Sequence, residues 1–320
     1  MNILLYDVDS VMPNIALMKL STYHKNKGDI IHFFKSKGKF IDIEYTNYDQ
    51  GYASVIFTKN KRLVDNFPFE IGGTGVDLYK TLDDKIEHLM PDYSLYPENK
   101  YSIGFLTRGC CNNCSFCVVP KKEGAIRFNA HVDEFLNPNL DKIRILDNNL
   151  LAYKNWEKCL LELKETDKKI KFENFDFRLF TEKHARIISK MKVDGDYIFA
   201  LDDPKLIETF RKKMWLIEKY FSYTWRVKFY VMIGYNTTLK EDMQRIKFLY
   251  SYKVLPYIMR HENYRNSPYK NFYIDLAAFC NQPFFFKKMD FQHFMEVRYK
   301  KDHPRIKQNA EIFKDLWENA

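Results

Sequence analysis

The stretch LTRGCCNNCSFCVVPKKEG, residues 106–124, holds four of the six cysteines of this 320-residue chain. Three of them, Cys110, Cys114 and Cys117, follow the spacing CxxxCxxC. Because a chain advances at most ~3.5 Å per residue, three thiolates within eight positions can surround one corner of a compact metal centre. The pattern therefore predicts a metal centre held by this loop.

Zinc and an iron-sulfur cluster make different demands on such a loop. Structural zinc takes four ligands, commonly as two separated pairs, and the sequence has no second pair, since Cys159 and Cys280 are isolated. A [4Fe-4S] cube held by three cysteines instead leaves one iron open for a ligand from outside the protein. Cys111 lies outside the motif and is interpreted as a neighbouring thiol without a ligand role.

Composition and the first residues limit the class of protein. The chain carries 51 Lys and Arg against 42 Asp and Glu, a net charge of +9, which permits an anionic partner without identifying one. The start, MNILLYDVDS, lacks the basic segment of a secretory signal, and no apolar run approaches the ~18 residues of a membrane span. We therefore expect a cytoplasmic protein with no membrane partner, in a reducing compartment where clustered cysteines bind metal or react.

Strand-like and helix-like runs alternate through most of the chain. Apolar runs predict six strands, at 101–107, 142–148, 170–177, 197–203, 228–234 and 254–260. Amphipathic stretches between them predict helices. Six strand-then-helix units in sequence predict a parallel sheet that curls into a barrel or part of one. In such a barrel, functional groups gather at the carboxyl ends of the strands.

The first part of the chain forms a separate α/β pattern. NILLYDV (2–8) predicts a strand, and NIALMKLSTYHKNKG (14–28) predicts an amphipathic helix that stops at Gly28. Two more strand-like runs, IDIEY (41–45) and SVIFT (54–58), precede a linker-like stretch, LMPDYSLYPENK (89–100), which places a boundary near Pro97. We therefore expect a small α/β domain at 1–97, a barrel at 98–290 and a C-terminal helical extension at 291–320.

The segment TRGCCNNCSFCVVP (107–120), with Phe116 just before the third cysteine of the motif, resembles the cluster loop of the radical S-adenosylmethionine superfamily. The resemblance covers about residues 98–290, because six βα units match that superfamily's TIM-like partial (β/α)6 barrel. It implies one [4Fe-4S] cluster and S-adenosyl-L-methionine as cofactors, and an electron donor such as flavodoxin or ferredoxin. In the family the open iron binds the amino and carboxylate groups of the cofactor, and an electron splits its sulfonium to release a 5'-deoxyadenosyl radical that abstracts hydrogen from the substrate.

The resemblance also implies cofactor contacts at the ends of the barrel strands. The implied residues are Phe116 in the loop and, at successive strand ends, Asp147, Asn148, Asn149, Asp176, Arg178, Asp202, Asp203, Gly234 and Met259. In the family the second strand ends in a polar motif often written GGE, which holds the methionine amino group, and DNN takes its place here. Simpler interpretations stay open, because Arg178 could form a structural salt bridge and one of the paired aspartates could cap a helix.

Substrate contacts are expected from the same strand ends and from the first domain. The candidates are Asp7, Asp9, Asn14, Tyr235, Arg260 and His261. The loop DVDSVMPN (7–14) could close over the barrel mouth, although a structural turn explains it equally well. A lone histidine is more often structural than functional, and that alternative stays open for His261.

The first domain resembles a shortened cobalamin-binding fold, yet it lacks the DxHxxG signature. His24 lies in TYHKNKG (22–28), with Thr22 where the signature has Asp, and is better interpreted as the end of a helix. We therefore expect no cobalamin. Residues 1–109 also contain no cysteine, which disfavours the methylthiotransferases, a branch that uses three N-terminal cysteines for a second cluster.

The leading expectation is a radical S-adenosylmethionine enzyme that acts on a small polar molecule or a nucleoside. Its layout is similar to that of the lyases that release queuine from queuosine or its phosphate, with a short first domain free of cysteine and a single cluster. One alternative is a radical enzyme that modifies tRNA, suggested by the basic segments RKK (211–213) and RYKKDHPRIK (298–307). Another is a metal-binding module without catalysis.

Overall fold

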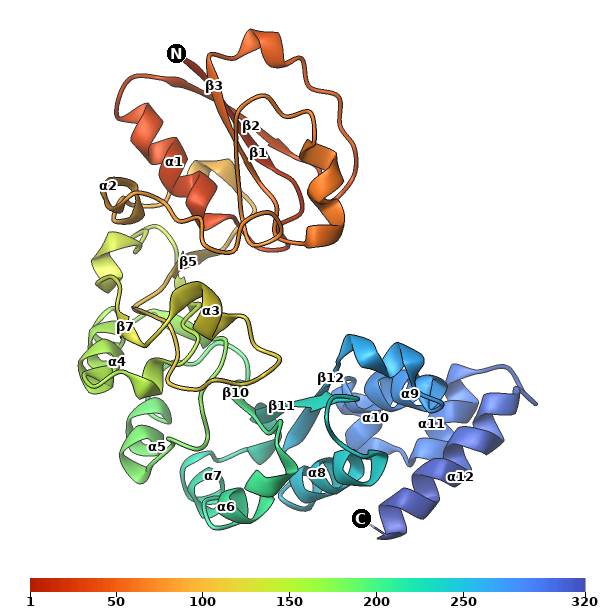
Figure 1. Cartoon of the computed structure of the whole chain (residues 1–320). Coiled ribbons are helices and arrows are strands. Elements are labelled where there is room, and N and C mark those ends of the chain that lie inside the picture. The colour runs from red at the N-terminus through yellow and green to blue at the C-terminus, as the bar shows by residue number, and fades with distance from the viewer. Residues whose placement is uncertain (320) are drawn as a thin grey trace. The chain divides into compact units, whose positions relative to one another are not determined.

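The computed structural model describes residues 1–319. The chain divides into two compact units, Met1–Lys171 and Phe172–Ala320. Both are mixed α/β structures whose larger sheets are parallel (Figure 1). The predicted α/β fold with parallel sheets is therefore confirmed. Within residues 1–319, no helix combines the length and the apolar sequence that crossing a bilayer requires.

A four-stranded parallel sheet begins the first unit. In the spatial order β2-β1-β3-β4, its strands are β1 (Asn2–Asp7), β2 (Ile30–Lys35), β3 (Gln50–Ser54) and β4 (Glu70–Gly72). Successive side chains of a strand point to opposite faces. Leu4 and Tyr6 enter one hydrophobic cluster, whereas Ile3 and Leu5 enter another that includes the buried side of α1 (Ile15–Lys25). The first strand is thus covered on both faces, which explains why it is apolar throughout.

The remainder of the first unit carries the cysteine loop. Its three-stranded sheet, in the order β5-β8-β9, consists of β5 (Tyr101–Gly104), β8 (Lys142–Ile145) and β9 (Lys169–Phe172). A short antiparallel pair, β6 (Thr107–Arg108) and β7 (Arg127–Phe128), brings the two ends of the loop together. The helices of this unit after α1 are α2 (Asp84–Glu87), α3 (Val119–Glu123) and α4 (Trp156–Glu165).

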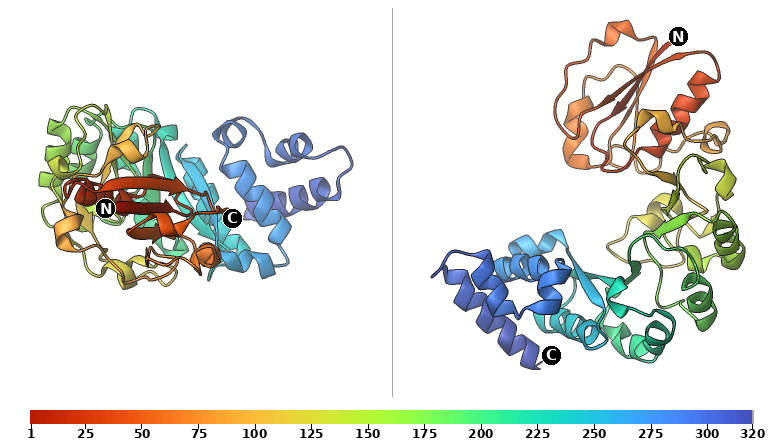
Figure 2. Two further views of the ribbon diagram at one scale, coloured as in Figure 1. Left: turned by 90° about the horizontal axis from the view of Figure 1, so that it is seen from above. Right: turned by 180° about the vertical axis from the view of Figure 1, so that it is seen from behind.

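The second unit is built on a parallel sheet in the order β10-β11-β12. Its strands are β10 (Tyr197–Ala200), β11 (Val227–Ile233) and β12 (Leu255–Arg260). Its helices are α5 (Glu182–Ile188), α6 (Ile207–Arg211), α7 (Trp215–Tyr220), α8 (Leu239–Ser251), α9 (Lys270–Cys280), α10 (Pro283–Lys288), α11 (Phe291–Arg298) and α12 (Pro304–Asn319). Helix α8 packs against the last two strands, and α11 lies along α12 (Figure 2).

Phenylalanine rings fill the interior beside this sheet. The ring centroids of Phe177, Phe199 and Phe229 lie 5.0 to 5.3 Å from one another, in edge-to-face and stacked arrangements. These geometries suit the quadrupole of aromatic rings and bury large apolar areas. The high phenylalanine content of the sequence therefore has a packing role in this unit.

All six strands predicted after residue 100 are present, but each of the first four ends three or more residues earlier than predicted. At two of these ends an aspartate side chain accepts a backbone N–H that a continued parallel ladder would use. Asp147 accepts from the N–H of Leu106 (2.8 Å), and Asp202 accepts from the N–H of Met232 (2.9 Å). Short polar side chains compete with regular backbone pairing in this way.

Candidate functional site

The cysteine loop begins at a glycine that its backbone requires. Gly109 has φ +86°, and a Cβ atom there would lie 2.2 Å from the carbonyl oxygen of Ala125. Directly after it, the N–H of Cys110 donates to the carbonyl oxygen of Gly124 (3.2 Å). Only a residue without a side chain tolerates this combination of positive φ and close approach. The loop is therefore closed at its base immediately before the first cysteine of the motif.

The carboxylate of Glu123 fastens this base to the end of β8. It accepts hydrogen bonds from the N–H of Gly109 (2.9 Å), from Nδ2 of Asn148 (2.8 Å) and from Nη1 of Arg108 (3.2 Å). Arg108 also pairs with Glu87 (3.2 Å), which links the loop to the first domain. Glu123 is not among the residues predicted for the site. Its only signal in the sequence is its position directly after Lys121 and Lys122 at the end of a helical turn.

Three N–H groups surround Sγ of Cys110. The N–H and Nδ2 of Asn112 lie 3.4 and 3.6 Å from this sulfur, and Nδ2 of Asn149 lies 3.5 Å from it. Hydrogen bonds to ligand sulfurs are a means by which proteins tune iron-sulfur clusters. The donor chemistry of the loop therefore fits an iron-sulfur cluster held by cysteine thiolates.

The motif cysteines share one half-buried loop. Cys110, Cys114 and Cys117 are each half-buried, as is Phe116, whereas Cys111 is exposed. The N–H of Cys117 donates to the carbonyl oxygen of Cys114 (2.9 Å), which forms a turn. Within residues 1–319 no disulfide forms, and no three His, Cys, Asp or Glu side chains stand together as a metal site. A metal centre held by these three sulfurs would therefore require the loop to rearrange on binding, since metal binding and local folding are coupled.

Asp147 anchors the strand that leads into the loop. Its buried carboxylate accepts from the N–H groups of Leu106 (2.8 Å) and Thr107 (2.7 Å) and from the Thr107 hydroxyl. Burial raises the pKa of Asp147 to about 6, although these hydrogen bonds oppose the shift. Both carboxylate oxygens are thus engaged by β6 and the residue before it. The contacts of Asp147 therefore indicate that it positions the backbone of the loop, and they leave neither carboxylate oxygen without a partner in the protein.

The three candidates of the first domain, Asp7, Asp9 and Asn14, line a buried turn at the carboxyl edge of its sheet. The hydroxyl of Tyr96 donates to Asp7 (2.8 Å), and the N–H of Ile56 donates to Asp9 (2.7 Å). Asn14 caps α1 with its side-chain oxygen. None of the three is more than 7% exposed. These contacts favour the interpretation of the loop as a structural turn.

His24 lies in the last turn of α1, where the sequence places it. Its Nδ1 is 2.7 Å from Oδ2 of Asp29, and its Nε2 is 3.1 Å from the hydroxyl of Tyr52. Both ring nitrogens are therefore occupied inside the fold, and the residue closes a helix as expected.

Asp176 and Arg178 form an ion pair with each other. Nε and Nη2 of Arg178 lie 2.8 and 2.9 Å from the two oxygens of Asp176, a bidentate arrangement. The salt bridge joins two residues of one turn, and it does not run to a neighbouring strand. Lys213, in the break between α6 and α7, donates to the carbonyl oxygen of Arg178 (2.6 Å) and so fixes the same turn.

A buried ion pair holds the segment after β10 in the second unit. The sequence did not predict it. Arg245 and Asp242 of α8 pair directly, and both side chains are fully buried. Nη1 of Arg245 donates to the carbonyl oxygens of Leu201 (3.1 Å) and Asp202 (2.7 Å), which follow β10. Burial raises the pKa of Asp242, while Arg245 lowers it. An acid and an arginine three positions apart on a helix are a visible signal, but nothing in the sequence shows that they are buried.

The two aspartates after β10 have different functions. Asp202 accepts from the N–H of Met232 (2.9 Å), and burial raises its pKa. Asp203 caps the short helical turn Pro204–Leu206 by accepting from the N–H of Lys205 (2.9 Å). Of the two paired aspartates, Asp203 is therefore the one that caps a helix, as the simpler interpretation of the sequence allowed.

Gly234 and Met259 lie at the neighbouring ends of β11 and β12. Gly234 has φ +72°, and a Cβ atom there would lie 3.2 Å from Cβ of Tyr264. Met259 is half-buried and stands opposite Met232 in the parallel register. The glycine thus permits a turn with positive φ against a close neighbour.

Aromatic and basic side chains gather at the same edge. The ring centroids of Tyr235 and His261 are 4.4 Å apart, and the guanidinium of Arg260 lies 4.7 Å from the ring centroid of Tyr264. Arg260 is exposed and the other three are half-buried. His261 also accepts from the N–H of Asn263 (3.3 Å) at the start of a helical turn. This edge brings all three substrate candidates of the second unit together.

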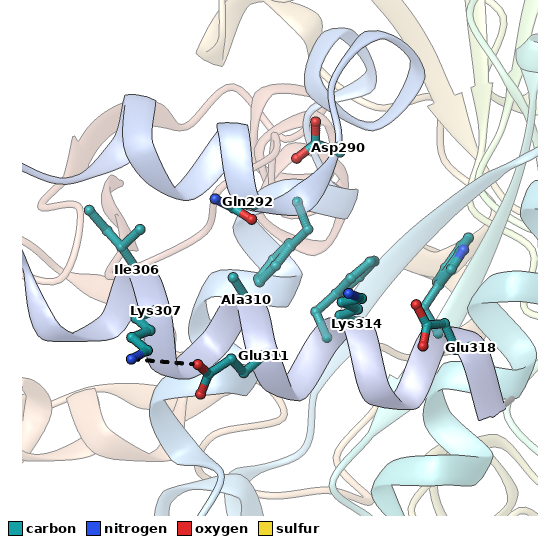
Figure 3. A pocket seen from close by; sticks show the side chains of 11 residues that line it. Asp290, Gln292, Ile306, Lys307, Ala310, Glu311, Lys314 and Glu318 are labelled. Carbon is teal, nitrogen blue, oxygen red and sulfur yellow. Dashed lines mark ion pairs between the residues drawn. The ribbon is translucent and has the colours of Figure 1, made fainter.

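A separate groove of about 570 Å³ runs along α12 (Figure 3). Phe291, Phe313 and Trp317 stack along it, and Lys307 pairs with Glu311 at its rim (4.0 Å). The predicted site residues are not among the residues that line it. The groove is therefore a feature of the C-terminal helices and not of the candidate site.

Comparisons with known proteins bear on the fold. No family model and no curated protein matches the sequence. Among solved structures, the cobalamin-dependent S-adenosylmethionine radical enzyme OxsB, with aqua-cobalamin and S-adenosylmethionine bound, matches with a TM-score of 0.55 and 12% identity. The match covers 92% of this chain, and the chain spans only 57% of the OxsB chain. The chain therefore shares its fold with a radical S-adenosylmethionine enzyme, and the expectation that it binds no cobalamin stays a prediction.

Proposed function

We propose that this chain is a radical S-adenosylmethionine enzyme in which residues 98–290 form a partial (β/α)6 barrel with one [4Fe-4S] cluster. The observation that carries the proposal is the CxxxCxxC loop, whose first sulfur is surrounded by N–H donors, within a fold shared with OxsB. When bound, the cluster would pass one electron from a donor such as flavodoxin or ferredoxin to S-adenosyl-L-methionine, breaking the bond between its sulfur and C5' to give methionine and a radical that abstracts hydrogen.

The residues of the chain would have two functions, to bind the cluster and to position the loop that binds it. Cys110, Cys114 and Cys117 would hold three irons of the cluster as thiolates. Glu123 and Asp147 would keep the base of the loop and the strand before it in place through the hydrogen bonds described above. Preorganised supporting contacts of this kind let ligands be held with little reorganisation.

The test is anaerobic reconstitution of the full chain with iron and sulfide. The proposal expects a brown protein with about four irons per chain, and formation of 5'-deoxyadenosine when S-adenosyl-L-methionine and dithionite are added. A colourless protein without 5'-deoxyadenosine would overturn it. A protein that binds the cluster but leaves S-adenosyl-L-methionine intact would instead support the metal-binding module.

We propose a small polar molecule or a nucleoside as substrate. Tyr235 and His261 offer aromatic faces for a base, and the exposed guanidinium of Arg260 suits a phosphate. The specific form of this proposal is a lyase that frees queuine from queuosine or its phosphate. Mass spectrometry of the reduced enzyme incubated with each compound tests it, and the absence of free queuine would remove the lyase without removing the radical class.

The alternative of a tRNA-modifying enzyme has weaker support in the structure. Lys213 of the first basic segment donates to backbone carbonyl oxygens, and Arg298 of the second pairs with Asp275 (3.1 Å). Cations engaged in this way contribute less to phosphate binding. Phosphate contacts would make tRNA affinity fall steeply with salt, so a binding titration at low and at moderate salt tests this alternative.

A further inference from the structure

We infer that the side-chain amides of Asn149 and Asn112 set the reduction potential of the cluster by donating hydrogen bonds to the sulfur of Cys110. The inference rests on the proposed function and adds to it two residues that act on the metal centre without binding it. Nδ2 of Asn149 lies 3.5 Å from Sγ of Cys110, and Nδ2 of Asn112 lies 3.6 Å from it.

Tertiary contacts bring Asn149 to the sulfur. The preceding residue, Asn148, donates to Glu123, and the same carboxylate accepts from the N–H of Gly109 at the start of the loop. The carboxylate of Glu123 thus binds both the segment after β8 and the start of the loop. Asn148 directly precedes Asn149, and Gly109 directly precedes Cys110. The carbonyl oxygen of Asn149 also accepts from the N–H of Ala152 (3.1 Å), which fixes its backbone.

This contact adds a second function to the one expected for Asn149. The resemblance implied that Asn149 meets the amino group of the cofactor, and in its side chain only Oδ1 can accept from an ammonium group, because Nδ2 donates. The Nδ2 group therefore matches the sulfur of Cys110. The amide nitrogen also lies 3.7 Å from Sγ of Cys111, so it faces the two adjacent cysteines.

Electrostatics gives the direction of the effect. Reduction adds one negative charge to the cluster and its thiolates, and an N–H donor stabilises the reduced state more than the oxidised state. The effect is stronger where water is excluded, and the Asn149 side chain is buried whereas that of Asn112 is half-buried. Loss of either amide should therefore lower the midpoint potential, with the larger shift at Asn149.

The experiment compares three alanine variants of the full chain. Asn149→Ala and Asn112→Ala each remove one amide, and Asn113→Ala is the matched control because Asn113 is an exposed asparagine of the same loop. After reconstitution, iron and sulfide are counted, and midpoint potentials are measured by titration with titanium(III) citrate while the reduced cluster is followed by electron paramagnetic resonance. We expect wild-type cluster content in all three, a more negative potential for Asn149→Ala and Asn112→Ala, and no shift for Asn113→Ala.

The outcomes separate this inference from the function on which it rests. A wild-type chain that assembles no cluster would overturn the proposed function. A wild-type cluster with potentials equal in all variants would overturn the inference alone. Failure of both Asn149→Ala and Asn112→Ala to hold iron, with Asn113→Ala intact, would mean that the amides act on assembly and would also overturn it.

Discussion

Arg245 and Asp242 form an ion pair in which neither side chain reaches solvent. The same guanidinium donates to the carbonyl oxygens of Leu201 and Asp202, so one helix residue holds the chain where β10 ends. Two buried charges are tolerated only when they satisfy each other and their remaining hydrogen-bonding groups. This pair therefore fixes the geometry of the segment after β10, which carries the cofactor candidates Asp202 and Asp203.

Replacing Arg245 with methionine should destabilise the protein strongly. The change leaves Asp242 buried without its cation, and breaking one side of such a pair costs about 3–5 kcal/mol. Urea unfolding followed by circular dichroism measures this loss. The matched control is Lys240→Met on the exposed side of the same helix, which should stay within about 0.5 kcal/mol of the wild type. Equal stability of the two variants would contradict the prediction.

Alanine at Gly109 should disrupt the cysteine loop more than alanine at Gly124. Both glycines have positive φ, +86° and +71°, and a side chain at such a position costs about 1–3 kcal/mol. A Cβ atom at Gly109 would also overlap the carbonyl group of Ala125, whereas one at Gly124 meets nothing within 4 Å. Thermal unfolding and the iron content of the two reconstituted variants test this order. A Gly124→Ala variant at least as damaged as Gly109→Ala would speak against it.

Stability should depend on pH through Asp147. Burial raises its pKa to about 6 in the folded chain, from an ordinary value of 3.8. A raised carboxyl pKa means that the folded state binds the proton more tightly, so this contribution to stability is full below about pH 4 and is lost as the pH rises to about 6. The loss is on the order of 3 kcal/mol.

The variant Asp147→Asn isolates this effect, because asparagine does not titrate. The difference in unfolding free energy between wild type and variant should therefore change between pH 4 and pH 7, measured by urea unfolding at each pH. The absolute stability of the variant is not the readout, since an amide replaces an acceptor. A difference that stays constant over this range would refute the assignment of the raised pKa to Asp147.

Serine substitutions should separate the three motif cysteines from Cys111. Cys110→Ser, Cys114→Ser and Cys117→Ser should each lose most of the reconstituted iron, because each removes one thiolate of a set of three. Cys111→Ser should keep wild-type iron content, since Cys111 is exposed and lies outside the spacing. Iron and sulfide analysis of the four variants checks the prediction. Loss of iron in Cys111→Ser together with retention of iron in Cys110→Ser would show that Cys111 takes the place of Cys110 as a ligand.

The sequence predicted the elements of the fold well because their signals are local. Apolar runs and amphipathic spacing located the six predicted strands after residue 100 and most of the helices between them, but not the short pair β6 and β7. The ends of the strands were harder to predict, since side chains such as Asp147 capture backbone N–H groups of residues distant in sequence. The domain limits at 97 and 290 stay predictions.

The sequence by itself determined the class of fold and predicted the loop for a metal centre, because residue type and spacing carry that information directly. Only the tertiary structure decided which polar residues support the site and which are engaged elsewhere. Glu123, Arg245 and Asp242 act through partners far away in the chain or through burial, neither of which appears in a local pattern. The same is true of Asn149, whose amide meets the sulfur of Cys110 only because the end of β8 is held against the start of the cysteine loop.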